Sequence, residues 1–249
     1  MSGASALINR FARAVATYEA SAVVQRLAAE RLAERLGGVC HLLAPRILEI
    51  GCGTGLLSRR LMARFSPSEL VLNDLCPDMG ICFANVPRTR FLAGDGRALA
   101  WPGIFDVVAS ASAIQWFGDL GAFSRRCAAV LPKGGFLAVS CFGPATLQEV
   151  RALSGAGLDY PSFEQFGAVL GADFEPLVVE RGLEELHLES GAAVLRHLKA
   201  TGVTATGSGE VWTRGRLAAF VEAYERRFAV AGGGVRVTYE PFWFVGVRR

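Results

Sequence analysis

The feature that most constrains the fold is a cluster of three glycines directly after a short apolar run. In the stretch RILEIGCGTGLLSRRL, residues 46–61, these are Gly51, Gly53 and Gly55. Glycines in such a turn let the backbone approach a ligand closely where a strand leads into a helix. The turn lacks the Lys-Ser or Lys-Thr that ends a phosphate loop, and its third glycine comes one residue early for G-x-G-x-x-G. The sequence therefore predicts a ligand-binding turn for another ligand.

The chain around this turn alternates between apolar runs and helical patterns. Such alternation with short connections predicts an α/β fold with a doubly wound, mostly parallel sheet. One predicted helix contains Gly80, a residue that nothing in the sequence explains. We expect strands at 46–50, 70–74, 89–93, 104–110 and 135–141, and helices at 55–64, 78–85 and 118–130.

The segments that flank this core are mainly helical. We expect an amphipathic helix at 18–36, and after residue 142 the regular alternation ends. The closing stretch VRVTYEPFWFVGVRR predicts an edge strand interrupted at Pro241. Further helices are expected at 144–152, 162–170, 191–200 and 214–230, with an extended run at 177–188.

We therefore expect a single domain over residues 1–249. A cofactor-binding core at 44–142 would be covered by a helical cap. The cap would combine an N-terminal part, residues 1–40, with cap helices and edge strands from 143–249.

Composition excludes several classes of protein. An apolar content of 51% with 20% charged residues indicates a compact globular chain. The net charge of +3, without a dense basic cluster, argues against nucleic acid as a partner. No apolar run is long enough to span a membrane, and the N-terminus has no apolar signal core. Six cysteines without C-x-x-C spacing and three scattered histidines predict no metal site. We expect a cytoplasmic protein.

Three acidic residues accompany the glycine turn. Glu49 precedes it, Asp74 ends the second predicted strand, and Asp95 follows the third. An acid at the end of the second strand, about 20 residues beyond the glycines, typically binds the hydroxyls of a ribose. No Lys or Arg stands at the turn to neutralise a diphosphate. A nucleoside without phosphate is therefore favoured, and a cationic one would also suit the acidic surroundings.

These motifs resemble those of the class I S-adenosylmethionine-dependent methyltransferases. The resemblance rests on LEIGCGTG, VLNDLCPDM, LAGDG and LPKGGFLAVS. It implies a seven-stranded Rossmann-like sheet and S-adenosylmethionine as cofactor, with the glycines at its methionine part, Asp74 at the ribose and Asp95 at the adenine. The implied cofactor-binding residues are Gln25, Glu49, Gly51, Cys52, Gly53, Asp74, Leu75, Met79, Gly94, Asp95, Gly96 and Ser110.

A more particular resemblance extends over almost the whole chain. RFARAVATYEASAVVQRLAAERL, SASAIQWFGDL, FGPATLQEV and VLRHLKATGV are similar to motifs of the malonyl-carrier-protein O-methyltransferases of biotin synthesis. This resemblance implies methyl transfer to the free carboxylate of a malonyl thioester on acyl carrier protein, or on coenzyme A. The ester formed would prime pimeloyl synthesis.

A carboxylate acceptor agrees with the absence of an evident catalytic base. A carboxyl group with a pKa of about 4 is already ionised at neutral pH. Gln115 and Trp116 follow the fourth strand, where an acceptor would meet the methyl group. Tyr18 and Gln25, seven residues apart, share one face of the first helix, which by resemblance closes over the cofactor. We expect Tyr18, Gln115, Trp116 and His197 to act in the reaction.

Basic residues outside the core are candidates for the acceptor. Arg196, His197 and Lys199 form a small group in the cap that would suit a buried carboxylate or an acidic carrier surface. Arg10 and Arg13 are further candidates for carrier docking.

Two other functions remain open from the sequence. Methyltransferases that act on small free acids such as trans-aconitate share the Gln-Trp pair and a similar cap, so the acceptor could be a free acid. A non-catalytic cofactor-binding partner protein is the second alternative.

Overall fold

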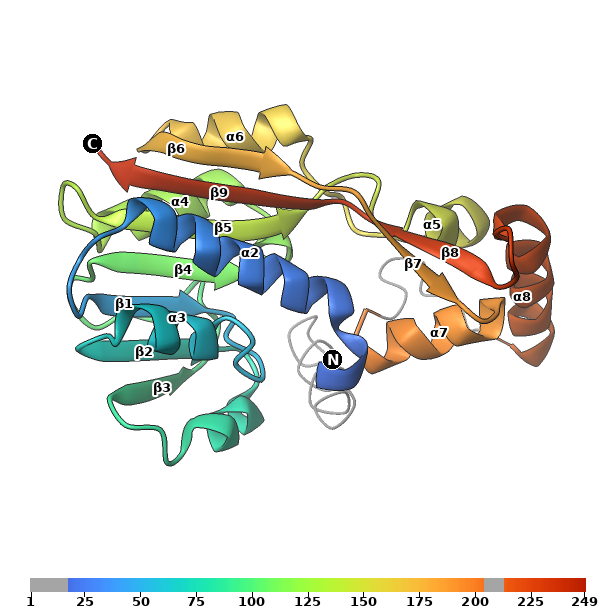
Figure 1. Cartoon of the computed structure of the whole chain (residues 1–249), viewed down its shortest axis with the longest axis horizontal. Coiled ribbons are helices and arrows are strands. Elements are labelled where there is room, and N and C mark those ends of the chain that lie inside the picture. Colours follow the sequence, from blue (N-terminus) through green and yellow to red (C-terminus); the bar gives the residue numbers. More distant parts are fainter. Residues whose placement is uncertain (1–17, 204–212) are drawn as a thin grey trace.

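The centre of the protein is a seven-stranded sheet, seen in a computed structural model that describes residues 18–203 and 213–249 (Figure 1). The strands are β1 (Arg46–Ile50), β2 (Glu69–Asp74), β3 (Thr89–Ala93), β4 (Val107–Ala111), β5 (Phe136–Phe142), β6 (Phe174–Arg181) and β9 (Pro241–Arg248). Their order is β3-β2-β1-β4-β5-β9-β6. β1 to β5 run parallel, and β9 is antiparallel to both of its neighbours. The predicted doubly wound, mostly parallel sheet is confirmed.

The closing strand β9 lies inside the sheet, so the predicted edge strand was wrong. It pairs with β5 on one side and β6 on the other. Phe242, Trp243 and Phe244 are fully buried, because both faces of the strand meet the core. Pro241 is the first residue of β9, a position where a strand tolerates proline.

Helices cover both faces of the sheet. On one face lie α2 (Val23–Val39) and α3 (Ser58–Phe65), with the indole Nε1 of Trp243 donating to the carbonyl of Ala28 at 2.9 Å. On the other face lie α4 (Leu120–Ala129) and α6 (Phe163–Gly171). A turn of helix at residues 18–21 precedes α2, and Ala22 separates the two with φ −82° and ψ 52°.

Local chemistry explains three differences from the predicted elements. The helix expected at 55–64 begins at Ser58, because Gly55 has φ +96°. The helix expected at 78–85 is a 3₁₀ segment, η1 (Pro77–Phe83), where a Cβ on Gly80 would lie 2.8 Å from the ring of Phe91. This contact accounts for Gly80. The strand expected from residue 104 begins at Val107, after the turn at Gly103, which has φ +87°.

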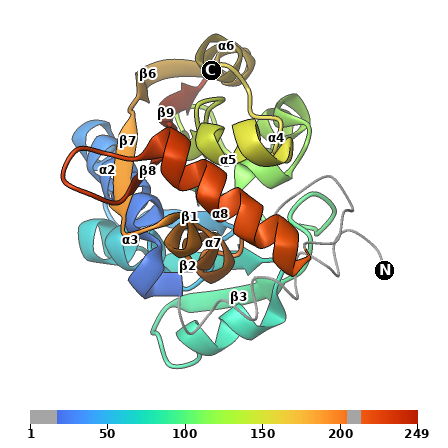
Figure 2. The same cartoon turned by 90° about the vertical axis from the view of Figure 1, so that its right-hand side faces the viewer.

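The cap is built on a two-stranded ribbon of β7 (Glu184–Leu188) and β8 (Val235–Tyr239). The extended run predicted at 177–188 divides at Gly182 into β6 and β7, and β8 continues directly into β9 (Figure 1). Three helices pack on this ribbon: α5 (Gln148–Ser154), α7 (Gly191–Ala200) and α8 (Arg214–Phe228). Figure 2 shows α8 lying across the outer end of the cap. Residues 1–17 of the expected N-terminal cap lie outside the described residues.

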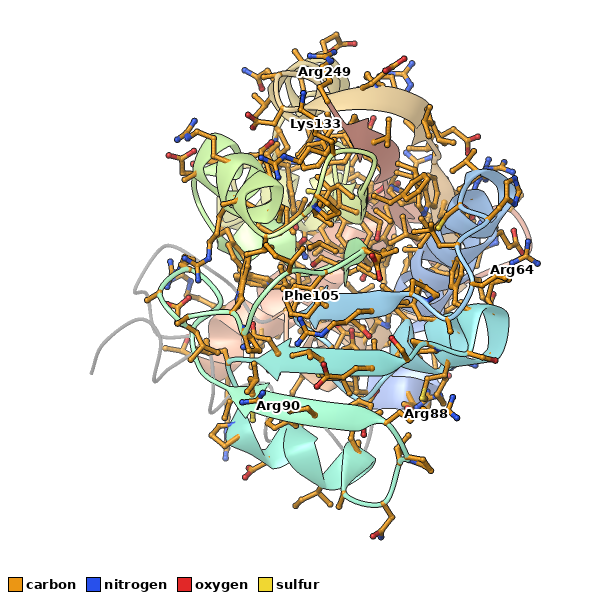
Figure 3. All side chains as sticks on the ribbon, turned by 90° about the vertical axis from the view of Figure 1, so that its left-hand side faces the viewer. Arg64, Arg88, Arg90, Phe105, Lys133 and Arg249 are labelled. Atoms are coloured by element: carbon orange, nitrogen blue, oxygen red, sulfur yellow. The ribbon has the colours of Figure 1, made fainter. Side chains whose placement is uncertain are left out.

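The two ends of the parallel strands differ. Figure 3 looks at the end where the strands begin, with Arg88, Lys133 and Arg249 around it and Phe105 near its centre. Phe105 is buried, and the guanidinium of Arg46 lies 4.4 Å from its ring centroid. The pockets described below lie at the opposite end.

None of the described helices is long and apolar enough to cross a membrane.

Candidate functional site

A deep pocket lies at the carboxyl ends of β1, β2 and β4. It holds about 1110 Å³ of space free of protein atoms, part of it open to solvent. The turns after these strands and after β3 line it, and α2 closes it on one side. Because β1 lies between β2 and β4, this is the point where the strand order reverses, the usual ligand site of such sheets.

The glycine turn supplies the floor of this pocket. Gly51 and Gly53 have φ of +71° and +52°, in the left-handed region that favours glycine. A Cβ on Gly51 would lie 2.3 Å from Cβ of Ala113, so this glycine permits close packing within the protein. A Cβ on Gly53 would meet nothing within 4 Å. Of the two glycines, Gly53 is the one whose backbone is open to a ligand.

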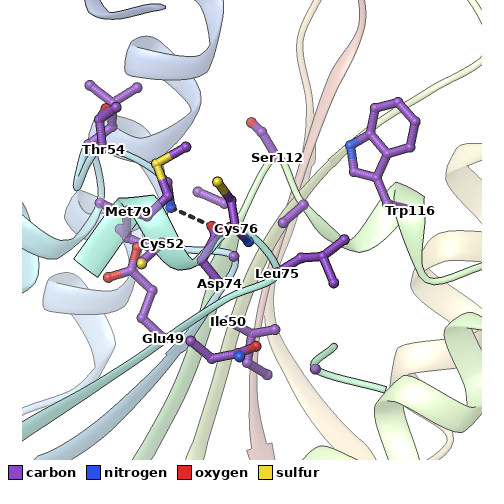
Figure 4. Close-up of a pocket in the computed structure, with 18 of the residues that line it drawn as sticks. Glu49, Ile50, Cys52, Thr54, Asp74, Leu75, Cys76, Met79, Ser112 and Trp116 are labelled. Carbon is purple, nitrogen blue, oxygen red and sulfur yellow. Dashed lines mark hydrogen bonds between the residues drawn. The ribbon is translucent and has the colours of Figure 1, made fainter. Parts of the chain in front are cut away.

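Asp74 fastens the glycine turn to the end of β2 (Figure 4). Its Oδ2 accepts from the backbone N–H of Gly53 at 2.9 Å, and its Oδ1 accepts from the N–H of Cys76 at 2.8 Å. Burial raises the pKa of Asp74, while these N–H donors act in the opposite direction. Each carboxylate oxygen keeps a second lone pair for a ligand hydroxyl.

Glu49 is a buried acid with an unused oxygen. Its side chain is 1% exposed, and Oε2 has no hydrogen-bond partner. The pKa of Glu49 is raised to about 8, chiefly by burial and in part by the nearby charge of Asp74, while Ser58 and the charge of Arg59 act in the opposite direction. A buried carboxylate with a free oxygen favours a cationic ligand, which would stabilise its ionised form. Glu49 therefore favours a ligand that carries positive charge.

Asp95 lines the same pocket and forms an ion pair with Arg97. Its two carboxylate oxygens accept from Nε and Nη2 of Arg97, and these hydrogen bonds lower the pKa of Asp95. Gly96 lines the pocket beside it. Gly94 does not line it; its N–H donates to the carbonyl of Asp74, a structural contact.

Most of the residues predicted for the cofactor come together in this pocket. The thiol of Cys52 is buried and its pKa is raised well above normal, which fits an inert side chain. The predicted residues that line the pocket are Tyr18, Gln25, Glu49, Gly51, Cys52, Gly53, Asp74, Leu75, Met79, Asp95, Gly96 and Trp116.

Ser110 was predicted to bind the cofactor, but Ser112 and not Ser110 lines the pocket. Ser110 is fully buried within β4, and its hydroxyl donates to the carbonyl of Ile50 at 2.7 Å. Ser112 follows the end of β4, lines the pocket and has φ +56° (Figure 4). Its hydroxyl is buried without a partner. The repeating letters S-A-S-A give no sign of where the strand ends, so the sequence alone does not distinguish the two serines.

A second, smaller chamber adjoins the first pocket. It holds about 410 Å³ of free space, and the two share Tyr18, Gln25, Ser112 and Trp116. Gln115 lines only this chamber; its Nε2 donates to the carbonyl of Ser112 at 2.7 Å, and its Oε1 has no partner. Cap residues form the remaining walls. Among the described residues that line it, none carries a charge.

The basic group expected in the cap does not form a single site. On α7, His197 is buried, whereas Arg196 and Lys199 are exposed and Arg196 pairs with Glu189. The helical repeat places positions 196 and 199 on one side and position 197 on another. His197 lines neither cavity; its Nε2 lies 2.8 Å from the hydroxyl of Tyr239, which lines the second chamber. Arg10 and Arg13 lie outside the described residues.

Sequence relatives span nearly the whole chain. A family model described as "Methyltransferase domain" matches residues 48–139. The chain is 36% identical over 255 residues to the malonyl-[acyl-carrier protein] O-methyltransferase of Bacteroides thetaiotaomicron, covering 98% of this chain and 97% of that one. It is 39% identical over 242 residues to the protein of the same name from Porphyromonas gingivalis, covering 96% and 94%.

Solved structures share the fold at lower identity. The YcgJ protein of Bacillus subtilis superimposes with a TM-score of 0.64 at 14% identity, covering 88% of this chain and 99% of that one. A Haemonchus contortus phosphoethanolamine N-methyltransferase, solved with S-adenosylhomocysteine, gives a TM-score of 0.56 at 16% identity, covering 94% and 56%.

Proposed function

Because the chain belongs to the family of malonyl-[acyl-carrier protein] O-methyltransferases, we propose that it methylates the free carboxylate of a malonyl thioester on acyl carrier protein. The methyl donor is S-adenosylmethionine, and the product is the malonyl methyl ester that primes pimeloyl synthesis for biotin. The observation that best supports this function is the junction of two unlike cavities. An acidic pocket suited to a cationic nucleoside adjoins, at Ser112 and Trp116, a chamber under the cap whose described lining residues carry no charge.

The first pocket holds the donor, which supplies a methyl group on a positively charged sulfur. Asp74 binds the ribose hydroxyls, Asp95 lies at the adenine end, and Leu75 and Met79 pack against the purine. Glu49 lies below the glycine turn, where its unpartnered oxygen favours the positive charge of the donor.

The reaction requires alignment rather than acid–base chemistry. A carboxylate oxygen forms a bond to the methyl carbon while the carbon–sulfur bond breaks, and the electron pair stays on sulfur. No proton moves, because the acceptor is already ionised. The chain contributes a fixed orientation and a site from which water is excluded, effects together worth up to about 7–11 kcal/mol in well-oriented reactions.

A methyl-transfer assay tests the proposal. We expect malonyl-acyl carrier protein to be the preferred acceptor, malonyl-CoA to be used less well and trans-aconitate to be used poorly. Asp74→Ala serves as the control that links the activity to the first pocket. Equal or better use of the free acid would contradict the proposed acceptor.

A further inference from the structure

The second chamber raises a question of recognition, because none of the described residues that line it carries a positive charge for a carboxylate. Its described lining residues offer hydroxyl and amide groups together with apolar and aromatic side chains. Arg196 and Lys199, which the sequence suggested for binding the acceptor, are exposed on α7. An anion taken from water into such a space must find hydrogen-bond donors there.

Two tyrosines from the cap supply donors. Tyr160 precedes α6 and Tyr239 ends β8, and both line the chamber. Burial raises the pKa of each phenol, so both tyrosines are uncharged at neutral pH. Both therefore keep their protons and remain hydrogen-bond donors over the working range. Tyr18 lines both cavities, and the charge of Asp74 in the first pocket contributes to the raised pKa of its phenol.

The tautomer of His197 decides which way the Tyr239 proton points. Its Nε2 lies 2.8 Å from the Tyr239 hydroxyl, and burial lowers the pKa of His197, so the ring is neutral at neutral pH. A neutral ring that carries its proton on Nε2 donates to the tyrosine oxygen. The phenol proton is then available to the chamber. In the other tautomer the phenol would donate to the histidine, and the chamber would lose a donor.

We propose that the chamber binds the acceptor carboxylate through the neutral hydroxyls of Tyr160 and Tyr239, with His197 as the positioning residue that directs the Tyr239 proton into the chamber. The proposal rests on the proposed function and assigns the part of the site that recognises the acceptor.

Neutral donors suit this reaction better than a guanidinium would. A bidentate arginine binds a carboxylate tightly and draws electron density from both of its oxygens. It would also be left buried and unpaired when the carboxylate becomes a neutral ester, which is costly. Hydroxyl donors hold the anion without neutralising it. The positive charge that the carboxylate meets is then that of the donor in the adjoining pocket.

Binding measurements separate this proposal from a purely structural role. Tyr239→Phe and Tyr160→Phe keep the ring and remove one hydroxyl each. We expect each to weaken calorimetric binding of malonyl-acyl carrier protein, in the presence of S-adenosylhomocysteine, by about ten- to a hundredfold. Binding of acetyl-acyl carrier protein, which has no carboxylate, should change little. Tyr224→Phe is the matched control, because that hydroxyl donates to the carbonyl of Arg236 inside the cap and does not line the chamber.

Two variants of His197 test its positioning role. His197→Gln places an amide N–H near the position of Nε2, whereas His197→Leu fills the space without a donor. We expect the glutamine variant to retain most of the malonyl affinity. The leucine variant should raise KM for the malonyl substrate about tenfold. Affinity for S-adenosylhomocysteine and the unfolding temperature report whether each variant is folded.

The outcomes distinguish this proposal from the proposed function. If the wild-type protein neither binds nor methylates malonyl-acyl carrier protein, the proposed function fails. If it methylates that substrate while Tyr239→Phe and Tyr160→Phe bind it as well as the wild type, only the present proposal is overturned. Equal losses of affinity for malonyl- and acetyl-acyl carrier protein would also overturn it, since the hydroxyls would then not bind the carboxylate.

Discussion

The backbone N–H of Gly53 donates to Oδ2 of Asp74 at 2.9 Å, joining the glycine turn after β1 to the end of β2. One carboxylate therefore shapes the turn and faces the ligand pocket at the same time. We expect Asp74→Ala to weaken S-adenosylmethionine binding by about 1.5–3 kcal/mol, the range for hydrogen bonds to a charged group. Isothermal calorimetry on the folded variant measures this. Unchanged affinity would remove Asp74 from the site.

Glu49 links cofactor binding to pH. Its pKa is raised from 4.5 to about 8, so the folded protein keeps a proton that the unfolded chain loses. Stability should therefore fall as pH rises between these values. A cationic ligand favours ionised Glu49, so binding near pH 7 should release most of one proton, and affinity should rise toward pH 8. Calorimetry in two buffers of different ionisation enthalpy counts the protons. The Glu49→Gln variant should release none.

The chemical step should depend little on pH. Between roughly pH 6 and 8 the acceptor carboxylate is already ionised, and no general base takes part. Single-turnover methyl transfer at saturating donor and acceptor measures this step without the contribution of binding. A rate that rises tenfold per pH unit would indicate an acceptor that must first lose a proton, such as a hydroxyl, amine or thiol.

Ser112 should show opposite effects on stability and activity. Its φ of +56° is costly for any residue with a Cβ, and its buried hydroxyl has no partner within the described protein. We expect Ser112→Gly to stabilise the fold by up to about 1 kcal/mol while lowering kcat/KM about five- to tenfold. Urea unfolding and the methyl-transfer assay give the two quantities. Ser112→Ala loses the hydroxyl but keeps the strain, so it should lower activity without the gain in stability.

Binding of the carrier protein should depend on Lys199, an exposed lysine of the cap. Reversal of the charge at Lys199 should raise KM for malonyl-acyl carrier protein. It should leave kcat and the KM for malonyl-CoA nearly unchanged. The effect should shrink as ionic strength passes about 0.15 M, where the screening length is about 8 Å. Lys133→Glu, at the opposite end of the sheet, is the matched control (Figure 3). Equal effects of both reversals would argue against docking at α7.

The sequence predicts the parts of the fold that local patterns determine. Strand β1, the glycine turn and Asp74 follow from an apolar run, three glycines and an acid at fixed spacing, and the structure brings them together. The family inferred from these motifs is confirmed by the relatives. The structure also explains Gly80, because a side chain there would meet the ring of Phe91, a contact that the sequence does not reveal.

The failures arise where a residue's role depends on distant segments. The apolar strand Phe242–Val245 reads as an edge because no sequence signal says that β6 pairs beyond it. Ser110 and Ser112 differ only in which side of the strand end they occupy. The grouping of Arg196, His197 and Lys199 treated neighbours in sequence as neighbours in space, whereas the turn of α7 separates them. Tyr160 and Tyr239, which line the second chamber, were not among the predicted residues because none of the motifs contains them.

The position of β9 also determines how the protein must assemble. β9 pairs Phe136 with Val247, so joining it to β5 closes a loop of roughly a hundred residues, a step that is slow in folding. Until that step, β5 presents an open edge of unpaired backbone groups, which is a template for aggregation. The intervening segment contains the whole ribbon and α5 to α8. We therefore expect closure of the sheet and completion of the second chamber to occur together in folding, and variants that slow this step should accumulate as aggregates rather than as a stable protein without its cap.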